Sequence, residues 1–161
     1  MSDKTSSSDL QRDTQSVRAA VARSQYGENS EALYLTSGYV QPDAATAARR
    51  FAGEEEGYTY ARLGNPTVSS MEQRLAALEG TDECIGTASG MGAILLMCMG
   101  LLKSGDHVVC SHSVFGSTHK LLSTEFAKFG VQTTFVSQTD LSEWAKAIQP
   151  NTRLLFAETP T

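Results

Sequence analysis

The sequence predicts an α/β protein with a mostly parallel sheet and helices on both faces. From Glu83 onward, short apolar segments typical of strands alternate with segments of helical periodicity. The strand segments are rich in apolar residues, as expected for strands that are covered on both faces. Asp140 and Gly130 are typical of a helix start and a helix stop at the expected places. This alternation favours parallel strands that are joined by crossover helices.

The second half of the chain therefore divides into four strands and three helices. The predicted strands cover residues 83–89, 107–111, 131–137 and 152–160. The predicted helices cover residues 92–103, 116–130 and 140–148.

The first half of the chain carries fewer signals. Residues 1–15 are polar and predict a disordered, extended N-terminal arm, and residues 16–65 predict an interface segment. Within that segment we expect a short helix near 16–25, an extended stretch at 31–40, and a helix at 43–53. Asn65 and Pro66 then form a favourable helix start, and Gly80 supplies its stop. Residues 66–161 are expected to form an α/β domain.

Composition excludes several classes of function. The 161 residues are 40% hydrophobic and 19% charged, which is typical of a globular chain. A net charge of −5 argues against nucleic-acid binding, which usually needs a basic patch. The longest apolar run, Ala93–Leu102, is far shorter than the ~20 residues that span a bilayer. The first 15 residues lack the apolar core of a signal peptide, so we expect a cytoplasmic protein that contacts no membrane.

The cysteines and histidines show no metal-binding pattern. Cys84, Cys98 and Cys110 are widely spaced and odd in number, which favours reduced, buried thiols. The three histidines form no HExxH or similar arrangement. We therefore expect no metal site.

A candidate anion site lies where the first predicted strand meets its helix. Ser89, Gly90, Met91 and Gly92 form the turn, whose free backbone N–H groups and positive helix-dipole end suit a phosphate. Without a side chain, Gly90 lets an anion approach the backbone. A tight turn whose glycines serve only backbone geometry explains the motif equally well. The motif is neither a GxGxxG fingerprint nor a P-loop.

Four motifs together resemble a known family. YTYARLGNPT at 58–67, TASGMGAI at 87–94, SGDHVVCSHSVFGST at 104–118 and LLFAETPT at 154–161 occur in order. They resemble the N-terminal part of the cystathionine γ-synthase family of pyridoxal-phosphate (PLP) enzymes, and its sulfhydrylase branch in particular. The resemblance runs from about Thr14 to the last residue and implies an incomplete large domain of PLP fold type I.

The resemblance assigns a cofactor role to seven residues. It implies that the backbone of Gly90 and Met91 binds the PLP phosphate, with help from the Ser89 hydroxyl. Tyr60 and Arg62 match a pair that reaches across a dimer interface to the phosphate of the neighbouring subunit. A guanidinium suits that task because its planar fork can hold two phosphate oxygens.

Phe115 and Glu158 complete the set. Phe115 stands where many relatives carry a tyrosine that stacks on the PLP ring, and the sulfhydrylase branch shares SVFGST here. Because phenylalanine lacks the phenol, no acid–base role is carried over. Glu158 matches an acidic residue at a strand end near the cofactor. The family's Schiff-base lysine and its acidic partner lie beyond Thr161, so no catalytic residue is assigned, and we expect the 161-residue chain alone to be inactive.

The resemblance also implies a reaction. The parent enzyme would use PLP to replace the acyl group of O-succinylhomoserine or O-acetylhomoserine with sulfide, giving homocysteine for methionine biosynthesis. Cystathionine γ-synthase and cystathionine γ-lyase share nearly every motif and remain alternatives, as does an inactive α/β fragment that kept a phosphate-binding turn. The implied assembly is a homotetramer, a dimer of dimers with active sites shared across each dimer.

Overall fold

The computed structural model describes residues 10–21 and 23–160 of the chain. These residues fall into two units, Met1–Gly86 and Thr87–Thr161, and each is described by itself. The predicted division into residues 1–15, 16–65 and 66–161 stays a prediction. Residues 1–9 of the predicted arm lie outside the described residues, whereas a helix already begins at Arg12.

The described part of the first unit contains three helices, and the second and third begin at the capping residues that the sequence indicates. They are α1 (Arg12–Arg18), α2 (Ala44–Phe51) and α3 (Pro66–Glu79). The Asp43 side chain accepts a hydrogen bond from the backbone N–H of Thr46 and starts α2. Asn65 caps α3 in the same way, and Gly80 ends it with a φ of 70°. The predicted helices at 43–53 and after Asn65 are thus confirmed.

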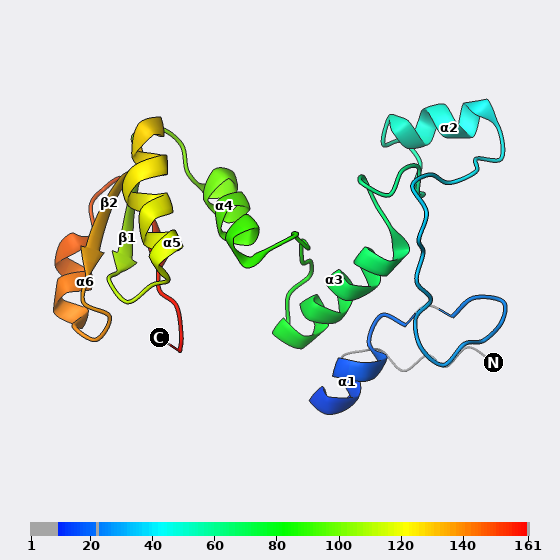
Figure 1. The fold of residues 1–161 in the computed structure, drawn as a ribbon, viewed down its shortest axis with the longest axis horizontal. Coiled ribbons are helices and arrows are strands. Elements are labelled where there is room, and N and C mark those ends of the chain that lie inside the picture. The colour runs from blue at the N-terminus through cyan, green and yellow to red at the C-terminus, as the bar shows by residue number, and fades with distance from the viewer. Residues whose placement is uncertain (1–9, 22, 161) are drawn as a thin grey trace. The chain divides into compact units, whose positions relative to one another are not determined.

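The second unit is built on three parallel strands in the order β2-β1-β3. In Figure 1 the labelled strands β1 and β2 lie between α5 and α6, which flank the sheet. The elements in chain order are α4 (Gly90–Leu101), β1 (His107–Ser111), α5 (Gly116–Lys120), a π-helical turn η2 (Leu121–Glu125), a 3-10 turn η3 (Phe126–Phe129), β2 (Gln132–Val136), α6 (Leu141–Ala147) and β3 (Thr152–Phe156). The predicted mostly parallel sheet is confirmed.

The core of this unit surrounds the central strand. All five residues of β1 are buried, because β2 and β3 pair with its two edges and helices cover it. Its register places Val108 beside Thr133 on one side and beside Leu154 on the other. The buried cluster consists of Cys98, Val108, Cys110, Leu122, Phe126 and Val131. These residues fix the strand ends from which the candidate site is built.

Three predicted elements differ from the structure. The short helix expected near 16–25 is instead α1, which spans Arg12–Arg18. The predicted strand at 83–89 does not form, because no strand of the described chain pairs with it. Instead, the backbone N–H of Gly86 donates to the Glu72 side chain at 2.6 Å. The predicted single helix at 116–130 is α5 followed by η2 and η3, and Gly130 ends it with a φ of 79°.

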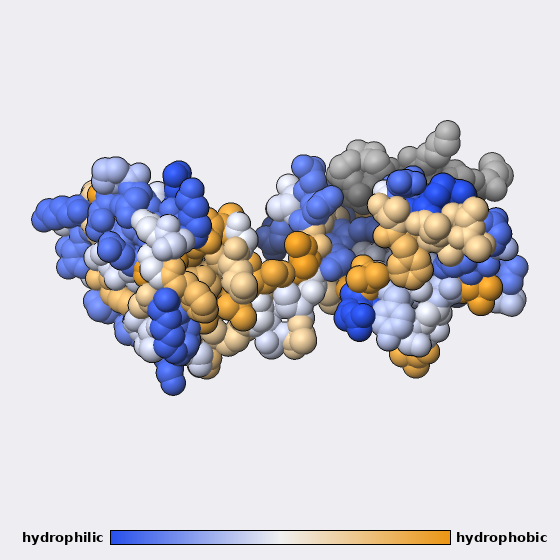
Figure 2. All heavy atoms as spheres, turned by 90° about the horizontal axis from the view of Figure 1, so that it is seen from above, coloured by the Kyte–Doolittle hydropathy of each residue, from blue (hydrophilic) through white to orange (hydrophobic). Residues whose placement is uncertain are grey.

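Both units present apolar side chains at their surfaces, seen as orange spheres in Figure 2. In the second unit several of these side chains belong to α4, where Met99 is 67% exposed. No helix among the described residues is long and apolar enough to cross a bilayer.

Candidate cofactor site

The N-terminus of α4 has the geometry of an anion-binding turn. Ser89 has extended backbone angles (φ −163°, ψ 159°), and its hydroxyl accepts a 3.0 Å hydrogen bond from the backbone N–H of Gly92. The first helical backbone bond runs from Ala93 to the Ser89 carbonyl at 3.0 Å. Within the described chain, the N–H groups of Gly90 and Met91 therefore have no protein acceptor, as expected for the first positions of a helix.

Gly90 leaves this turn open. A Cβ built on Gly90 would meet no atom within 4 Å beyond its neighbours and its own helix. The Ser89 side chain is already used by Gly92, so its hydroxyl keeps only its proton to offer an anion. Two free N–H groups, a hydroxyl proton and the positive end of a twelve-residue helix can together hold a phosphate.

Phe115 and Glu158 are in direct contact. The Glu158 carboxylate accepts a 2.7 Å hydrogen bond from the backbone N–H of Phe115, the residue before α5. Its other oxygen accepts from the Thr118 hydroxyl at 2.8 Å. The Phe115 side chain is 64% exposed, so its ring is available to a ligand.

The carboxyl ends of all three strands meet beside these residues. The Ser111 hydroxyl, at the end of β1, donates to the side chain of Gln138 at 2.8 Å. The Gln138 amide, after β2, donates to the backbone carbonyl of Glu158, after β3, at 3.2 Å. Ligands of open α/β sheets bind at this edge. The structure thus brings five of the seven predicted residues into one unit, where Phe115 and Glu158 touch each other.

Thr118 and Gln138 are site residues that sequence reasoning missed. Thr118 is fully buried, and its hydroxyl lies 3.9 Å from the Met91 sulfur as well as bonding to Glu158. Nothing in the sequence marks a threonine inside a short helix as a link of this kind. Gln138 could have been found, because polar residues that follow buried parallel strands collect at the ligand-binding edge.

Tyr60 and Arg62 belong to the first unit. The Arg62 guanidinium carbon lies 5.0 Å from the centre of the Tyr60 ring, in a cation–π contact. Tyr60 also pairs with Gly38 in an isolated antiparallel bridge, and Ala61 donates to the Ser37 carbonyl at 2.9 Å. The two predicted phosphate ligands are therefore one local group on an anchored loop.

The buried cysteines are not candidates for a catalytic nucleophile. Cys98 and Cys110 are buried and free, as predicted, whereas Cys84 is only half-buried. Burial, followed by the charge of Glu158 and the presence of Cys98, raises the pKa of Cys110 to about 12. Burial also raises the pKa of Cys98. Both thiols stay protonated at neutral pH, so neither is suited to act as a nucleophile.

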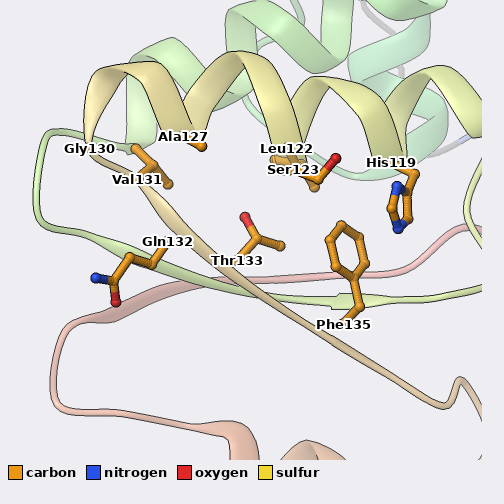
Figure 3. A pocket seen from close by; sticks show the side chains of 9 residues that line it. All are labelled: His119, Leu122, Ser123, Ala127, Gly130, Val131, Gln132, Thr133 and Phe135. Atoms are coloured by element: carbon orange, nitrogen blue, oxygen red, sulfur yellow. The ribbon is translucent and has the colours of Figure 1, made fainter.

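A separate hollow of about 660 Å³ lies between β2 and the helical segment that begins with α5. Figure 3 shows the rings of His119 and Phe135 facing one another at one end of it. Their centres are 4.0 Å apart and the rings are nearly parallel. None of the seven predicted cofactor residues lines this hollow.

Comparison with known proteins decides the family. A protein-family profile described as "Cys/Met metabolism PLP-dependent enzyme" matches residues 13–161. The chain belongs to this family of PLP-dependent enzymes. It is 51% identical over 149 residues to an O-succinylhomoserine sulfhydrylase of Pseudomonas aeruginosa, covering 92% of this chain and 37% of the relative. It is 40% identical to an L-methionine gamma-lyase of Fusobacterium nucleatum, covering 91% of this chain and 37% of that protein.

A solved structure gives the same result. The fold matches that of a putative O-acetylhomoserine (thiol)-lyase from Campylobacter jejuni with a TM-score of 0.84 and 32% identity, over 92% of this chain and 37% of the other. That crystal structure contains N'-pyridoxyl-lysine-5'-monophosphate. The chain spans little more than a third of the length of these relatives.

The residues of the α4 turn fit the cofactor of this family. PLP carries a phosphate dianion and a flat aromatic ring. The open N–H groups of Gly90 and Met91 match the phosphate, and the exposed face of Phe115 matches the ring. The described chain thus has backbone donors that suit the phosphate and an exposed aromatic face that suits the ring.

Proposed function

We propose that the full-length protein carrying this chain is a PLP-dependent enzyme that replaces the acyl group of O-succinylhomoserine or O-acetylhomoserine with sulfide, giving homocysteine. One observation carries the proposal: the α4 turn keeps two backbone N–H groups free beside an open glycine. The 51% identity to an O-succinylhomoserine sulfhydrylase supports the choice of substrate and sulfur donor.

The α4 turn and Phe115 have different tasks in this proposal. The N–H groups of Gly90 and Met91 donate to the cofactor phosphate, while the Ser89 cap takes up the N–H of Gly92. Phe115 offers an apolar ring face, which orients the cofactor without exchanging protons. When bound, PLP supplies the electron sink that stabilises negative charge on the substrate's α-carbon. The lysine that bonds to the cofactor in this family lies outside the residues assigned here.

Tyr60 and Arg62 complete the phosphate site from a second subunit in this proposal. Their cation–π contact places the guanidinium beside a phenol, so both groups can donate to one phosphate. The first unit would then serve the neighbouring active site, and the working assembly would be a dimer of dimers in the cytoplasm. Such sharing makes each site incomplete in a monomer.

A substrate panel tests this function. The full-length protein is incubated with PLP and sulfide, together with either O-succinylhomoserine or O-acetylhomoserine, and homocysteine is measured. We expect homocysteine from at least one of the two esters, with a higher kcat/KM for the succinyl ester. Cysteine in place of sulfide tests for cystathionine γ-synthase chemistry, and cystathionine alone tests for cystathionine γ-lyase chemistry.

A lyase reaction is the second candidate, because the chain is also 40% identical to an L-methionine gamma-lyase. Release of a 2-oxo acid from methionine, without homocysteine formation from either ester, would replace the sulfhydrylase proposal. Failure of the protein to bind PLP in any assay would contradict both.

A further inference from the structure

We infer that Glu158 is a positioning residue, which holds Phe115 and the N-terminus of α5 in place and makes no bond to the cofactor. The inference rests on the proposed function in one respect, namely that the ligand beside Phe115 is PLP. It reassigns a residue that the family resemblance places among the cofactor ligands.

The geometry of the carboxylate supports this role. One oxygen accepts from the Phe115 backbone N–H at 2.7 Å, and the other accepts from the Thr118 hydroxyl at 2.8 Å. Both oxygens are thus engaged, one by the residue that directly precedes α5 and the other by a residue within α5. The bond to Phe115 spans 43 residues of sequence, so it ties the end of β3 to the segment that follows β1. A carboxylate is well suited to this, since hydrogen bonds to a charged acceptor are strong.

Thr118 extends the link toward the phosphate turn. Its side chain is fully buried, and its hydroxyl proton is directed to Glu158. The same hydroxyl oxygen lies 3.9 Å from the sulfur of Met91, whose N–H is a proposed phosphate donor. Glu158 therefore links two parts of the proposed site. It bonds directly to Phe115, which faces the cofactor ring, and it reaches the α4 turn at Met91 through Thr118.

Gln138 fixes the backbone of Glu158 from the other side. Its amide donates to the Glu158 carbonyl at 3.2 Å, while its own oxygen accepts from Ser111 at 2.8 Å. The glutamate is thus held at its main chain and at both carboxylate oxygens. Because Glu158 is held in this way at the ends of β1, β2 and β3, it fixes where Phe115 lies relative to these strand ends.

Amide NMR of the 161-residue chain tests the contact without any cofactor. Glu158→Gln replaces one acceptor oxygen with an NH2 group, which can donate to the Thr118 hydroxyl, and removes the negative charge. The bond to the Phe115 N–H therefore loses its charge assistance and becomes weaker. We expect the Phe115 amide proton, labelled with 15N-phenylalanine, to move upfield in Glu158→Gln. Glu143→Gln is the matched control, because the Glu143 carboxylate also accepts a 2.7 Å bond from a backbone N–H, that of Ser137. A Phe115 resonance that responds equally to both variants, or to neither, would overturn the inference whatever the protein binds.

The full-length protein with bound PLP tests the positioning role. We expect Glu158→Gln and Thr118→Val to reduce the circular dichroism of the bound cofactor, which reports ring orientation, while Thr118→Ser restores it. The Kd for PLP should rise by no more than about tenfold, because one charge-assisted bond is lost and the phosphate donors remain. A cofactor signal unchanged in Glu158→Gln would contradict the inference, and so would a complete loss of PLP binding. Wild-type protein that binds no PLP would contradict the proposed function, and with it the role of Phe115, but not the contact measured by NMR.

Discussion

The guanidinium of Arg62 lies over the ring of Tyr60, with its central carbon 5.0 Å from the ring centre. Two residues that the family resemblance predicts for a shared phosphate site are thus already joined within their own unit. The contact orients the arginine fork before any ligand arrives, which lowers the entropy cost of binding.

Mixed dimers of the full-length protein test whether Arg62 serves the neighbouring subunit. Arg62→Ala and a variant that lacks the Schiff-base lysine should each be poorly active as homodimers. After subunit exchange, one site of each mixed dimer carries both defects and the other carries neither. Activity should rise to about half of the wild-type value per mixed dimer, since one of its two sites is intact. Arg23→Ala, which changes another exposed arginine of the same unit, should be active throughout. No recovery despite proven exchange would place Arg62 in its own subunit's site, or in none.

The buried His107 should make the free energy of unfolding depend on pH. The side chain is 1% exposed, and its two ring nitrogens lie 2.8 Å and 2.9 Å from the hydroxyls of Thr152 and Thr134. Burial lowers the pKa of His107 below its ordinary value. Below a pH of about 6.5 the unfolded chain therefore binds a proton that the folded chain rejects. The free energy of unfolding should fall as the pH drops through that value, until the folded pKa is reached.

Urea unfolding at a series of pH values measures this effect. His107→Gln should flatten the pH dependence below about pH 6.5 while lowering stability at neutral pH. His112→Gln changes an exposed histidine and is the matched control. Equal pH dependence in wild type and His107→Gln would show that His107 does not control it.

The thiols should differ in their reactivity. Cys98 and Cys110 are buried and their pKa values are raised, that of Cys110 to about 12, so both resist alkylation at pH values near neutrality. Cys84 is half-buried and should react first. Mass spectrometry after brief iodoacetamide treatment should find one modified thiol in the native chain and three after denaturation. Cys84→Ser should abolish the fast reaction, and early modification of Cys110 would contradict the burial of β1.

Local signals predicted much of the fold. Asp43, Asn65 and Asp140 were recognised as helix starts because their short polar side chains bond to the N–H groups of the first turn, and all three do so. The strands β1, β2 and β3 were recognised because apolar segments with turn residues at both ends leave few alternatives. These features depend on neighbours within a few residues.

Features that depend on distant partners were not predicted correctly. The segment 83–89 has the composition of a strand, but a strand also requires a hydrogen-bonded neighbour, and the described chain provides none. The bond between Glu158 and Phe115 joins residues that no spacing rule relates. Ser89, Gly90 and Met91 form the turn that was expected, whereas the links through Thr118 and Gln138 appeared only with the sheet in place.

The central claim is that the α4 turn binds the phosphate of PLP. The affinity of a Gly90→Pro variant for PLP tests this claim most directly. Proline is tolerated at the first position of a helix, and the extended backbone of Ser89 suits the residue before it, so the variant should fold. It removes the Gly90 N–H and places a ring in the open space beside it, while the Ser89 cap of α4 stays in place. Leu141→Pro is the matched control, because Leu141 is the first residue of α6 and is 79% exposed.

Equilibrium dialysis of the full-length proteins gives the Kd for PLP and for pyridoxal, which lacks the phosphate. We predict that Gly90→Pro raises the Kd for PLP by about tenfold or more, the loss expected for a charge-assisted hydrogen bond. The Kd for pyridoxal should stay unchanged, and Leu141→Pro should alter neither value. Equal PLP affinity in Gly90→Pro and Leu141→Pro would contradict the assignment of the α4 turn as the phosphate site.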